Sequence, residues 1–173
     1  ALNNFCEYSM IRPGKMAKDL GFTHEEVEAL CEKHEMDLHE MERWYDGYRI
    51  GRASRMFNPY SVFKAIRNEE YGSYWTTTGA YDSVITYIQM NFEGLKDDVI
   101  RMLAGDRVDV DTTEFLNDMH IVRSKNDVLT VMIHLGYLAY DFETQECYIP
   151  NKEVKDLLVF ASEVAFEHRH RPD

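Results

Sequence analysis

The feature that most constrains this fold is a series of local signals that start short helices along the chain. Each signal pairs a side chain that can cap a helix with a helix-compatible first turn, and each precedes apolar residues at helical spacing. The signals are Thr23-His24-Glu25-Glu26, Asn58-Pro59, Ser124-Lys125-Asn126-Asp127 and Pro150-Asn151. Helical spacing also recurs from Val84 to Ile88 and from Val99 to Leu103. We therefore predict a mainly α protein built from short helices.

Alternating and irregular stretches interrupt the helical pattern. Val108 and Val110 alternate with aspartates, which predicts a short strand, and residues 71–79 are aromatic and Thr-rich, which predicts an extended or irregular segment. Residues 137–142 and 146–149 are expected to form a hairpin between two helices. A helix, a hairpin and a helix in this order are typical of the end of a winged-helix module, and many small α+β domains share the order.

Composition bounds the class of protein. The chain has 173 residues, 45% of them hydrophobic and 29% charged, as in an ordinary globular protein. We expect neither a membrane span nor a signal peptide, because no long apolar run and no basic segment leading into one are present. Three scattered cysteines favour a reducing, cytoplasmic setting over a disulfide framework. The formal net charge of −12 opposes non-specific binding to nucleic acid, which requires cations to neutralise phosphates.

The common catalytic and metal-binding patterns are not met. Gly14-Lys15 could end a phosphate-binding loop, but Ser9 stands where the pattern needs Gly, and Met16 replaces the required Ser or Thr. His34 and His39 are five residues apart, whereas zinc-binding pairs on one helix are four apart. Carboxylates are plentiful on so acidic a chain, so none is singled out as a general acid or base. We therefore predict no catalytic residue, no metal site and no cofactor of this chain's own.

Five short motifs carry a resemblance to a known family. They are Trp44-Tyr45-Asp46-Gly47-Tyr48, Phe57-Asn58-Pro59-Tyr60-Ser61-Val62, Tyr74-Trp75-Thr76-Thr77-Thr78-Gly79, Leu135-Gly136-Tyr137-Leu138 and Ile149-Pro150-Asn151-Lys152-Glu153-Val154. In this order the chain resembles the bacterial predicted AAA-ATPase-like family, and Leu2-Asn3-Asn4 and Gly21-Phe22-Thr23 fit as well. The residues that the resemblance selects are Trp44, Tyr45, Asp46, Gly47, Tyr48, Asn58, Pro59, Tyr74, Trp75, Gly136, Tyr137, Leu138, Pro150, Asn151 and Glu153.

The resemblance implies a parent protein with an N-terminal P-loop ATPase core, which binds ATP and magnesium, and commonly a C-terminal nuclease-like domain. This chain would follow the core and precede the nuclease-like domain, and we expect it to be a piece of such a protein. The implied architecture is a helical lid-like region at residues 1–105, followed by a winged-helix-like module with a small β-hairpin at residues 106–173. The residues that contact nucleotide cannot be carried over, because the core that holds them lies outside this chain.

The motif residues also have a purely structural interpretation. Trp44, Tyr45 and Tyr48 combine a large apolar area with a polar tip, which suits packing where two domains meet. Asp46 and Gly47 are typical turn residues. The alternative is that Asp46, Arg43 or Arg49 faces nucleotide or the missing core.

The sequence is compatible with three hypotheses of function. The first is a non-catalytic lid and winged-helix-like segment that acts by contact with the parent's core, leaving an exposed apolar patch on the isolated chain. The second is a nucleic-acid-binding winged-helix module that serves the nuclease-like domain, which requires Arg123, Lys125, Lys152 or Lys155 to gather on one face. The third is a protein-interaction module whose aromatic residues anchor a partner.

Overall fold

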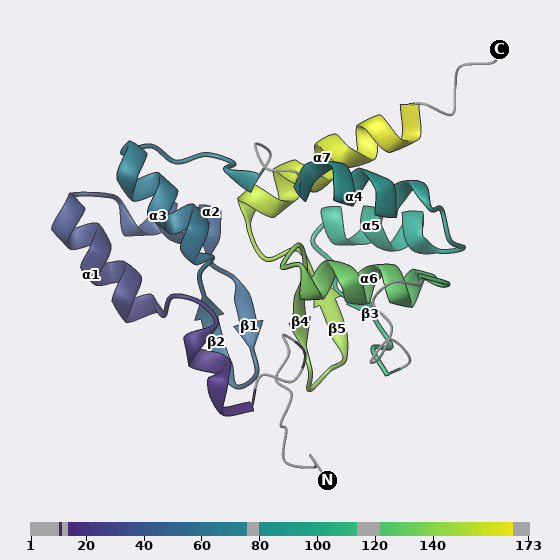
Figure 1. The fold of residues 1–173 in the computed structure, drawn as a ribbon, viewed down its shortest axis with the longest axis horizontal. Coiled ribbons are helices and arrows are strands. Elements are labelled where there is room, and N and C mark those ends of the chain that lie inside the picture. Colours follow the sequence, from purple (N-terminus) through teal and green to yellow (C-terminus); the bar gives the residue numbers. More distant parts are fainter. Residues whose placement is uncertain (1–10, 12–13, 76–79, 114–121, 168–173) are drawn as a thin grey trace, which may run out of the picture.

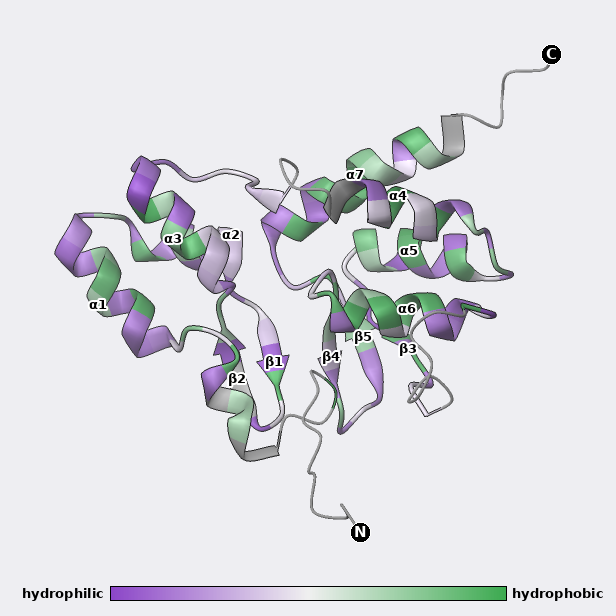
Figure 2. Ribbon diagram, viewed as in Figure 1, coloured by the Kyte–Doolittle hydropathy of each residue, from purple (hydrophilic) through white to green (hydrophobic). Residues whose placement is uncertain are grey.

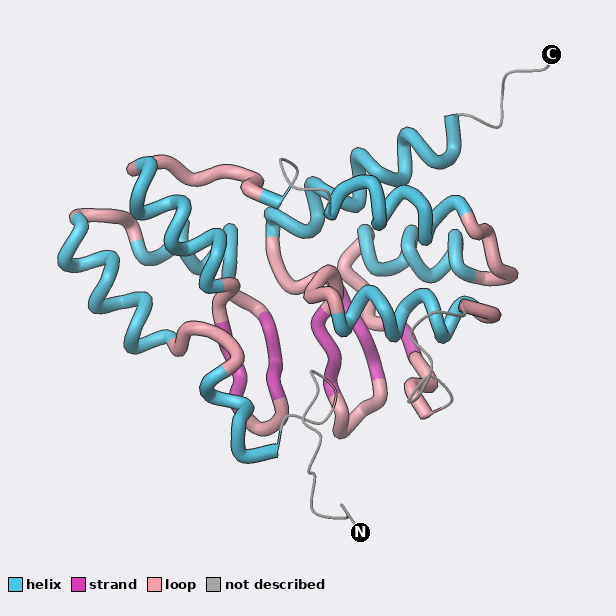
Figure 3. Tube along the Cα trace, in the orientation of Figure 1, coloured by secondary structure: helices cyan, strands magenta, loops and turns pink. Residues whose placement is uncertain are grey.

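The computed structural model describes residue 11 and residues 14–75, 80–113 and 122–167. This part of the chain is mainly α, with two small antiparallel sheets (Figure 3). The predicted fold class is therefore confirmed. Two lobes lie side by side in Figure 1, and each has its own apolar cluster.

The first lobe runs from residue 14 to residue 75. Its elements are η1 (Gly14–Asp19), α1 (His24–His34), α2 (Leu38–Tyr45), β1 (Tyr48–Ile50), β2 (Ala53–Met56) and α3 (Pro59–Asn68). The helices α1, α2 and α3 enclose an apolar cluster that includes Val27, Met41, Tyr45 and Val62. β1 and β2 form an antiparallel hairpin with an irregular register.

The second lobe runs from residue 80 to residue 167. Its elements are α4 (Ala80–Gln89), α5 (Leu95–Leu103), β3 (Val108–Asp109), α6 (Lys125–His134), β4 (Ala139–Asp141), β5 (Glu146–Tyr148) and α7 (Lys152–Glu167). The strands form an antiparallel sheet in the order β3-β5-β4, with Cys147 opposite both Val108 and Tyr140. α4 packs along α7.

The helix-start signals act as predicted. The Thr23 hydroxyl accepts a hydrogen bond from the backbone N–H of Glu26 (3.3 Å), and the Glu26 carboxylate accepts one from the N–H of Thr23 (2.9 Å). Ser124 and Asp127 form the same reciprocal pair at the start of α6. Asn58 and Asn151 each accept a backbone N–H in the first turn of α3 and of α7. The expected strand at Val108 and the hairpin after α6 are also present.

The β1–β2 hairpin was not predicted from the sequence. Tyr48 and Ile50 alternate with Arg49, but β1 is only three residues long, too short for a clear alternating pattern. Arg55 in β2 adopts φ 61°, a left-handed conformation that few non-glycine residues take and that accompanies the irregular pairing. The hairpin forms because Tyr48, Ile50 and Met56 pack against Ala17 and Ala139 in a third apolar cluster.

The apolar clusters divide the chain at a different place from the expected boundary at residues 105 and 106. Val84 on α4 and Val99 on α5 lie before that boundary, yet they pack in one cluster with Val128 and Leu157, which lie after it. Tyr74 packs against the first cluster and the next residue, Trp75, packs against the second. Ile11, which precedes the first lobe, also belongs to the second cluster. The boundary between the lid-like region and the winged-helix-like module stays a prediction, but one hydrophobic cluster extends across it.

Candidate functional site

The two groups of motifs, far apart in the sequence, meet where the two lobes touch. We call this contact region the interlobe seam; it joins β1 and the turn before it to β4, β5 and the start of α7. The Tyr48 hydroxyl donates to the carbonyl of Gly136 (2.8 Å), and the Tyr148 hydroxyl donates to the carbonyl of Gly47 (3.2 Å). The Asn151 amide donates to the carbonyl of Asp46 (2.9 Å). The motifs therefore hold the lobes together.

Gly47 lies where the backbones of the two lobes come close together. It has φ 99°, and a Cβ atom placed on it would lie 2.0 Å from the carbonyl oxygen of Pro150. No side chain fits there, and the backbone conformation itself favours glycine. The turn from α2 into β1 and the turn from β5 into α7 thus depend on the same glycine.

An ion-pair network crosses the seam near the hairpin of the second lobe. The Arg49 guanidinium on β1 contacts the carboxylate of Asp141 on β4 (2.5 Å) and that of Glu143 (2.7 Å). Arg107 also pairs with Asp141 (3.2 Å) and lies over the Tyr148 ring. Burial alone would raise the pKa of Asp141, but the Glu143 N–H and Arg49 outweigh it and hold that pKa below its usual value. Arg49 is therefore engaged between the lobes.

Glu153 ties the segment that leaves the first lobe to the start of α7. Its carboxylate is fully buried, and one oxygen accepts from the backbone N–H groups of Tyr74 (2.7 Å) and Trp75 (3.2 Å). The other oxygen, Oε2, is buried, and none of the described residues meets it in full hydrogen-bond geometry, although the Ser61 hydroxyl is close enough to lower the pKa. Burial raises the pKa of Glu153, although the Ser61 hydroxyl and the two N–H groups act in the opposite direction. The Glu153 carboxylate thus links α7 to residues 74 and 75, and burial makes its charged form less favourable than in water.

The remaining motif residues pack inside one of the lobes or lie beside the interlobe seam. Tyr45 is buried in the first lobe, and its hydroxyl donates to the carbonyl of Gly72 (2.9 Å) and accepts from the N–H of the same residue (3.0 Å). Trp44 lies under the ammonium of Lys152, 4.6 Å from the ring centroid. Trp75 meets Tyr137 edge to face, with centroids 5.1 Å apart. Leu138 is buried in the second lobe. Residues 76–79 lie outside the described part of the chain.

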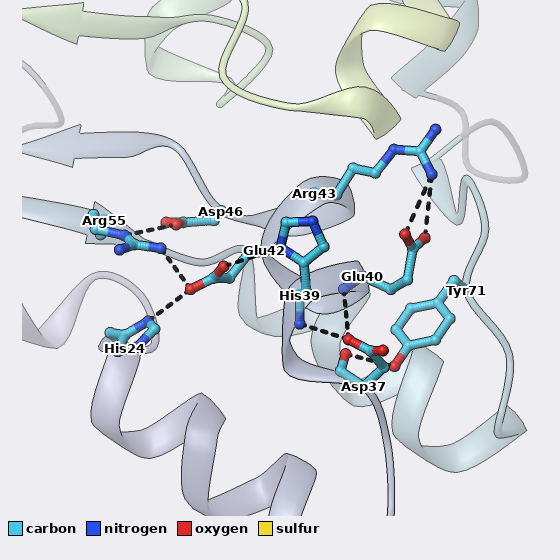
Figure 4. Close-up of polar contacts among 9 residues, drawn as sticks. All are labelled: His24, Asp37, His39, Glu40, Glu42, Arg43, Asp46, Arg55 and Tyr71. Atoms are coloured by element: carbon cyan, nitrogen blue, oxygen red, sulfur yellow. Dashed lines mark hydrogen bonds and ion pairs between the residues drawn. The ribbon is translucent and has the colours of Figure 1, made fainter.

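Figure 4 shows the surroundings of Asp46 and Arg43, the other two residues expected to face nucleotide or the core. The Arg55 guanidinium pairs with the carboxylate of Asp46 (3.1 Å) and with that of Glu42. The Nδ1 atom of His24 also lies 3.4 Å from the Glu42 carboxylate. Arg43 pairs with Glu40 one turn before it on α2 (3.3 Å). Asp46 is buried, and its carboxylate is bound to Arg55 within the first lobe. Arg43 is exposed. The role of Arg55 was not foreseen, and its unusual φ gives no signal in the sequence.

A pocket of about 220 Å³ opens at the seam. Its lining includes five of the residues that the resemblance selects: Tyr48, Asn58, Pro59, Trp75 and Gly136. Gly136 has φ 81°, and a Cβ atom there would come within 3.1 Å of the Trp75 ring, so the pocket wall also depends on a glycine. His134 is also in the lining, and burial lowers its pKa, which keeps the imidazole neutral near neutral pH. The lining is otherwise mainly apolar and aromatic.

The described residues offer no metal-binding arrangement, since they contain no group of three or more His, Cys, Asp or Glu side chains placed around one point. Cys31 and Cys147 are buried free thiols, and burial raises the pKa of Cys147 to about 12, so this thiol remains protonated and unreactive. Cys6 lies outside the described residues. Among the helices of the described residues, none has both the length and the apolar character to cross a bilayer.

The basic residues required by the nucleic-acid hypothesis are placed apart. Lys125 lies at the start of α6, where it pairs with Asp98 on α5 (2.7 Å). Lys152 lies at the start of α7, where it pairs with Asp156 (2.6 Å) and covers the Trp44 ring. Arg123 and Lys155 are exposed. Lys125 and Lys152 thus lie at the starts of two different helices, and each is paired with a carboxylate.

Comparison of the chain with protein-family models, curated proteins and solved structures finds no match.

Proposed function

We propose that this chain is a non-catalytic lid and winged-helix-like segment of a bacterial AAA-ATPase-like protein, working in the cytoplasm by contact with the parent's nucleotide-binding core. One observation carries the proposal: the motif residues converge on the interlobe seam, where they act as caps, hydrogen-bond partners and close backbone contacts. Residues in these roles hold a shape and carry no reaction, which supports a role in binding.

The exposed apolar residues support a binding role. Leu20 and Leu135, which come from different lobes, both line the seam pocket and remain 40% and 46% exposed. Exposed large apolar residues that gather around a pocket mark an interaction surface more often than singly scattered ones. ATP and magnesium belong to the core in this proposal, and a C-terminal nuclease-like domain is a further expected neighbour in the parent.

The test is ATP turnover by the chain alone and with its core. The isolated chain is expected to release no phosphate from ATP and magnesium above a buffer blank, while adding it to a separately produced nucleotide-binding core from the same reading frame should change the core's turnover. Metal-dependent turnover by the isolated chain would sink the proposal. So would a core whose rate and nucleotide affinity are the same with and without this chain.

The nucleic-acid alternative receives one favourable observation, the β3-β5-β4 sheet with its hairpin directly after α6. Helices that read a groove need exposed side chains, but Val128 to Ile133 of α6 are all buried, and Figure 2 shows the middle of this helix as hydrophobic. We therefore expect no saturable binding of a fluorescent duplex at low salt. Salt-sensitive binding would revive this alternative.

A further inference from the structure

The seam pocket has the size of a single large side chain. Its volume of about 220 Å³ is below the range of roughly 300–1,000 Å³ that small-molecule sites occupy. Tyr48, Phe57 and Trp75 are among its lining residues. The Tyr48 hydroxyl and the Trp75 backbone N–H are held by seam hydrogen bonds, and Phe57 is buried in the first apolar cluster. A pocket of this size suits one anchoring residue of a protein partner.

The surroundings of the pocket are apolar on more than one side. Leu20 comes from the segment before α1, and Leu135 comes from the end of α6, so the exposed rim is built from both lobes. A small ligand would leave this rim uncovered, whereas a protein segment would cover it together with the pocket.

The negative charge of the chain favours a partner segment that carries positive charge. His134, Leu135 and Gly136 of the lining form the C-terminal end of α6, which is the negative end of the helix dipole. The whole chain carries a formal net charge of −12. A cationic residue beside the anchor is therefore favoured both locally and at long range.

We propose that the seam pocket takes one large non-polar side chain, flanked by Lys or Arg, from a segment of a partner protein. This inference does not require the partner to be the nucleotide-binding core. It can therefore fail while the proposed function stands, and it can hold if that function is wrong.

The experiment uses Trp75 as a reporter. The chain has two tryptophans, and Trp44→Phe leaves Trp75 as the single one. The probe is acetyl-Lys-Phe-Lys-amide, and its two controls are acetyl-Lys-Ala-Lys-amide and acetyl-Glu-Phe-Glu-amide. We expect the first peptide to shift Trp75 emission saturably, with a dissociation constant of about 1–10 mM, typical of a single anchoring side chain. Amide NMR shifts of the unmodified chain should report the same binding.

Matched variants separate the pocket from general effects. Leu135→Lys places a cation at the rim and should weaken binding of the Lys-Phe-Lys peptide by about tenfold or more. Ile100→Lys on α5 changes an equally exposed apolar residue outside the pocket lining and should leave binding unchanged. The inference is overturned if the Lys-Phe-Lys peptide does not bind, if either control peptide binds as well, or if Ile100→Lys weakens binding as much as Leu135→Lys.

Discussion

At the scale of single residues, Glu153 shows how the seam retains a buried carboxylate. Its carboxylate accepts from the backbone N–H groups of Tyr74 and Trp75, and these two groups and the Ser61 hydroxyl lower its pKa. Burial raises the pKa of Glu153 more than these dipoles lower it, although the N-terminal end of α7 also favours the charged form. The raised pKa of Glu153 follows from this imbalance.

The raised pKa makes stability depend on pH in a defined direction. The folded protein binds the Glu153 proton more tightly than the unfolded chain does, so its stabilising contribution is complete below the unfolded pKa, about 4.3, and is lost as pH rises through the folded pKa. Glu153→Gln keeps the acceptor oxygen and removes the charge. We expect it to flatten this dependence and to raise the free energy of unfolding at pH 8 by about 1 kcal/mol.

Urea unfolding of both proteins between pH 4 and pH 8 measures the effect. Glu163→Gln, at an exposed position of the same helix, is the control and should keep the pH dependence of the unmodified chain. A Glu153→Gln protein that is less stable than the unmodified chain at pH 8 would show that the charge itself stabilises the seam.

At the scale of elements, the seam joins two turns by backbone contact. The turn from α2 to β1 carries Gly47, and the turn from β5 to α7 carries Pro150, whose carbonyl occupies the space of a side chain at position 47. The hydrogen bonds from Asn151 and Tyr148 act on the same two turns. The relative position of α2, β1, β5 and α7 therefore depends on the close contact between the backbones at Gly47 and Pro150.

Gly47→Ala tests this contact, with Gly105→Ala as its matched control. Both glycines have φ near 100°, but a Cβ atom at Gly105 meets no atom of the described residues within 4 Å. Gly105→Ala should cost about 1 kcal/mol, the backbone strain alone, and Gly47→Ala should cost about 3 kcal/mol or more, because the Pro150 carbonyl must also move. Chemical unfolding of the two variants measures the difference. Equal losses of stability would mean that the close approach is not maintained in solution.

At the scale of the whole molecule, the lobes share too many contacts to behave independently. A third apolar cluster places Tyr48, Ile50 and Met56 of the first lobe against Ala139 of the second. The Arg49 ion pairs and the Glu153 tie add polar links between the same lobes. The pocket and its rim depend on this arrangement, because their residues come from both lobes.

We expect the chain to unfold in one cooperative transition. Circular dichroism and tryptophan fluorescence should give the same midpoint, and the calorimetric enthalpy should equal the van't Hoff enthalpy, at about 120 kcal/mol for a chain of this length near 60 °C. Two separate transitions in the unmodified chain would contradict a seam of this strength.

The sequence by itself determined the local structure of this protein. Thr23, Asn58, Ser124 and Asn151 cap helices through contacts within three residues, so their pattern can be read without knowing the fold. The same holds for the apolar spacing of the helices and for the hairpin after α6. The motif residues could also be recognised as turns, caps and aromatic packing.

Only the tertiary structure decided what those residues meet. Tyr48 donates to Gly136, which is 88 positions further along the chain, and Asn151 donates to a carbonyl 105 positions before it. The β1–β2 hairpin, the role of Arg55 and the grouping of α4 and α5 with α7 likewise follow from contacts between distant segments. Local rules reach only a few residues, because capping and periodicity are short-range. The pocket exists because two lobes converge, and no short stretch of sequence contains that information.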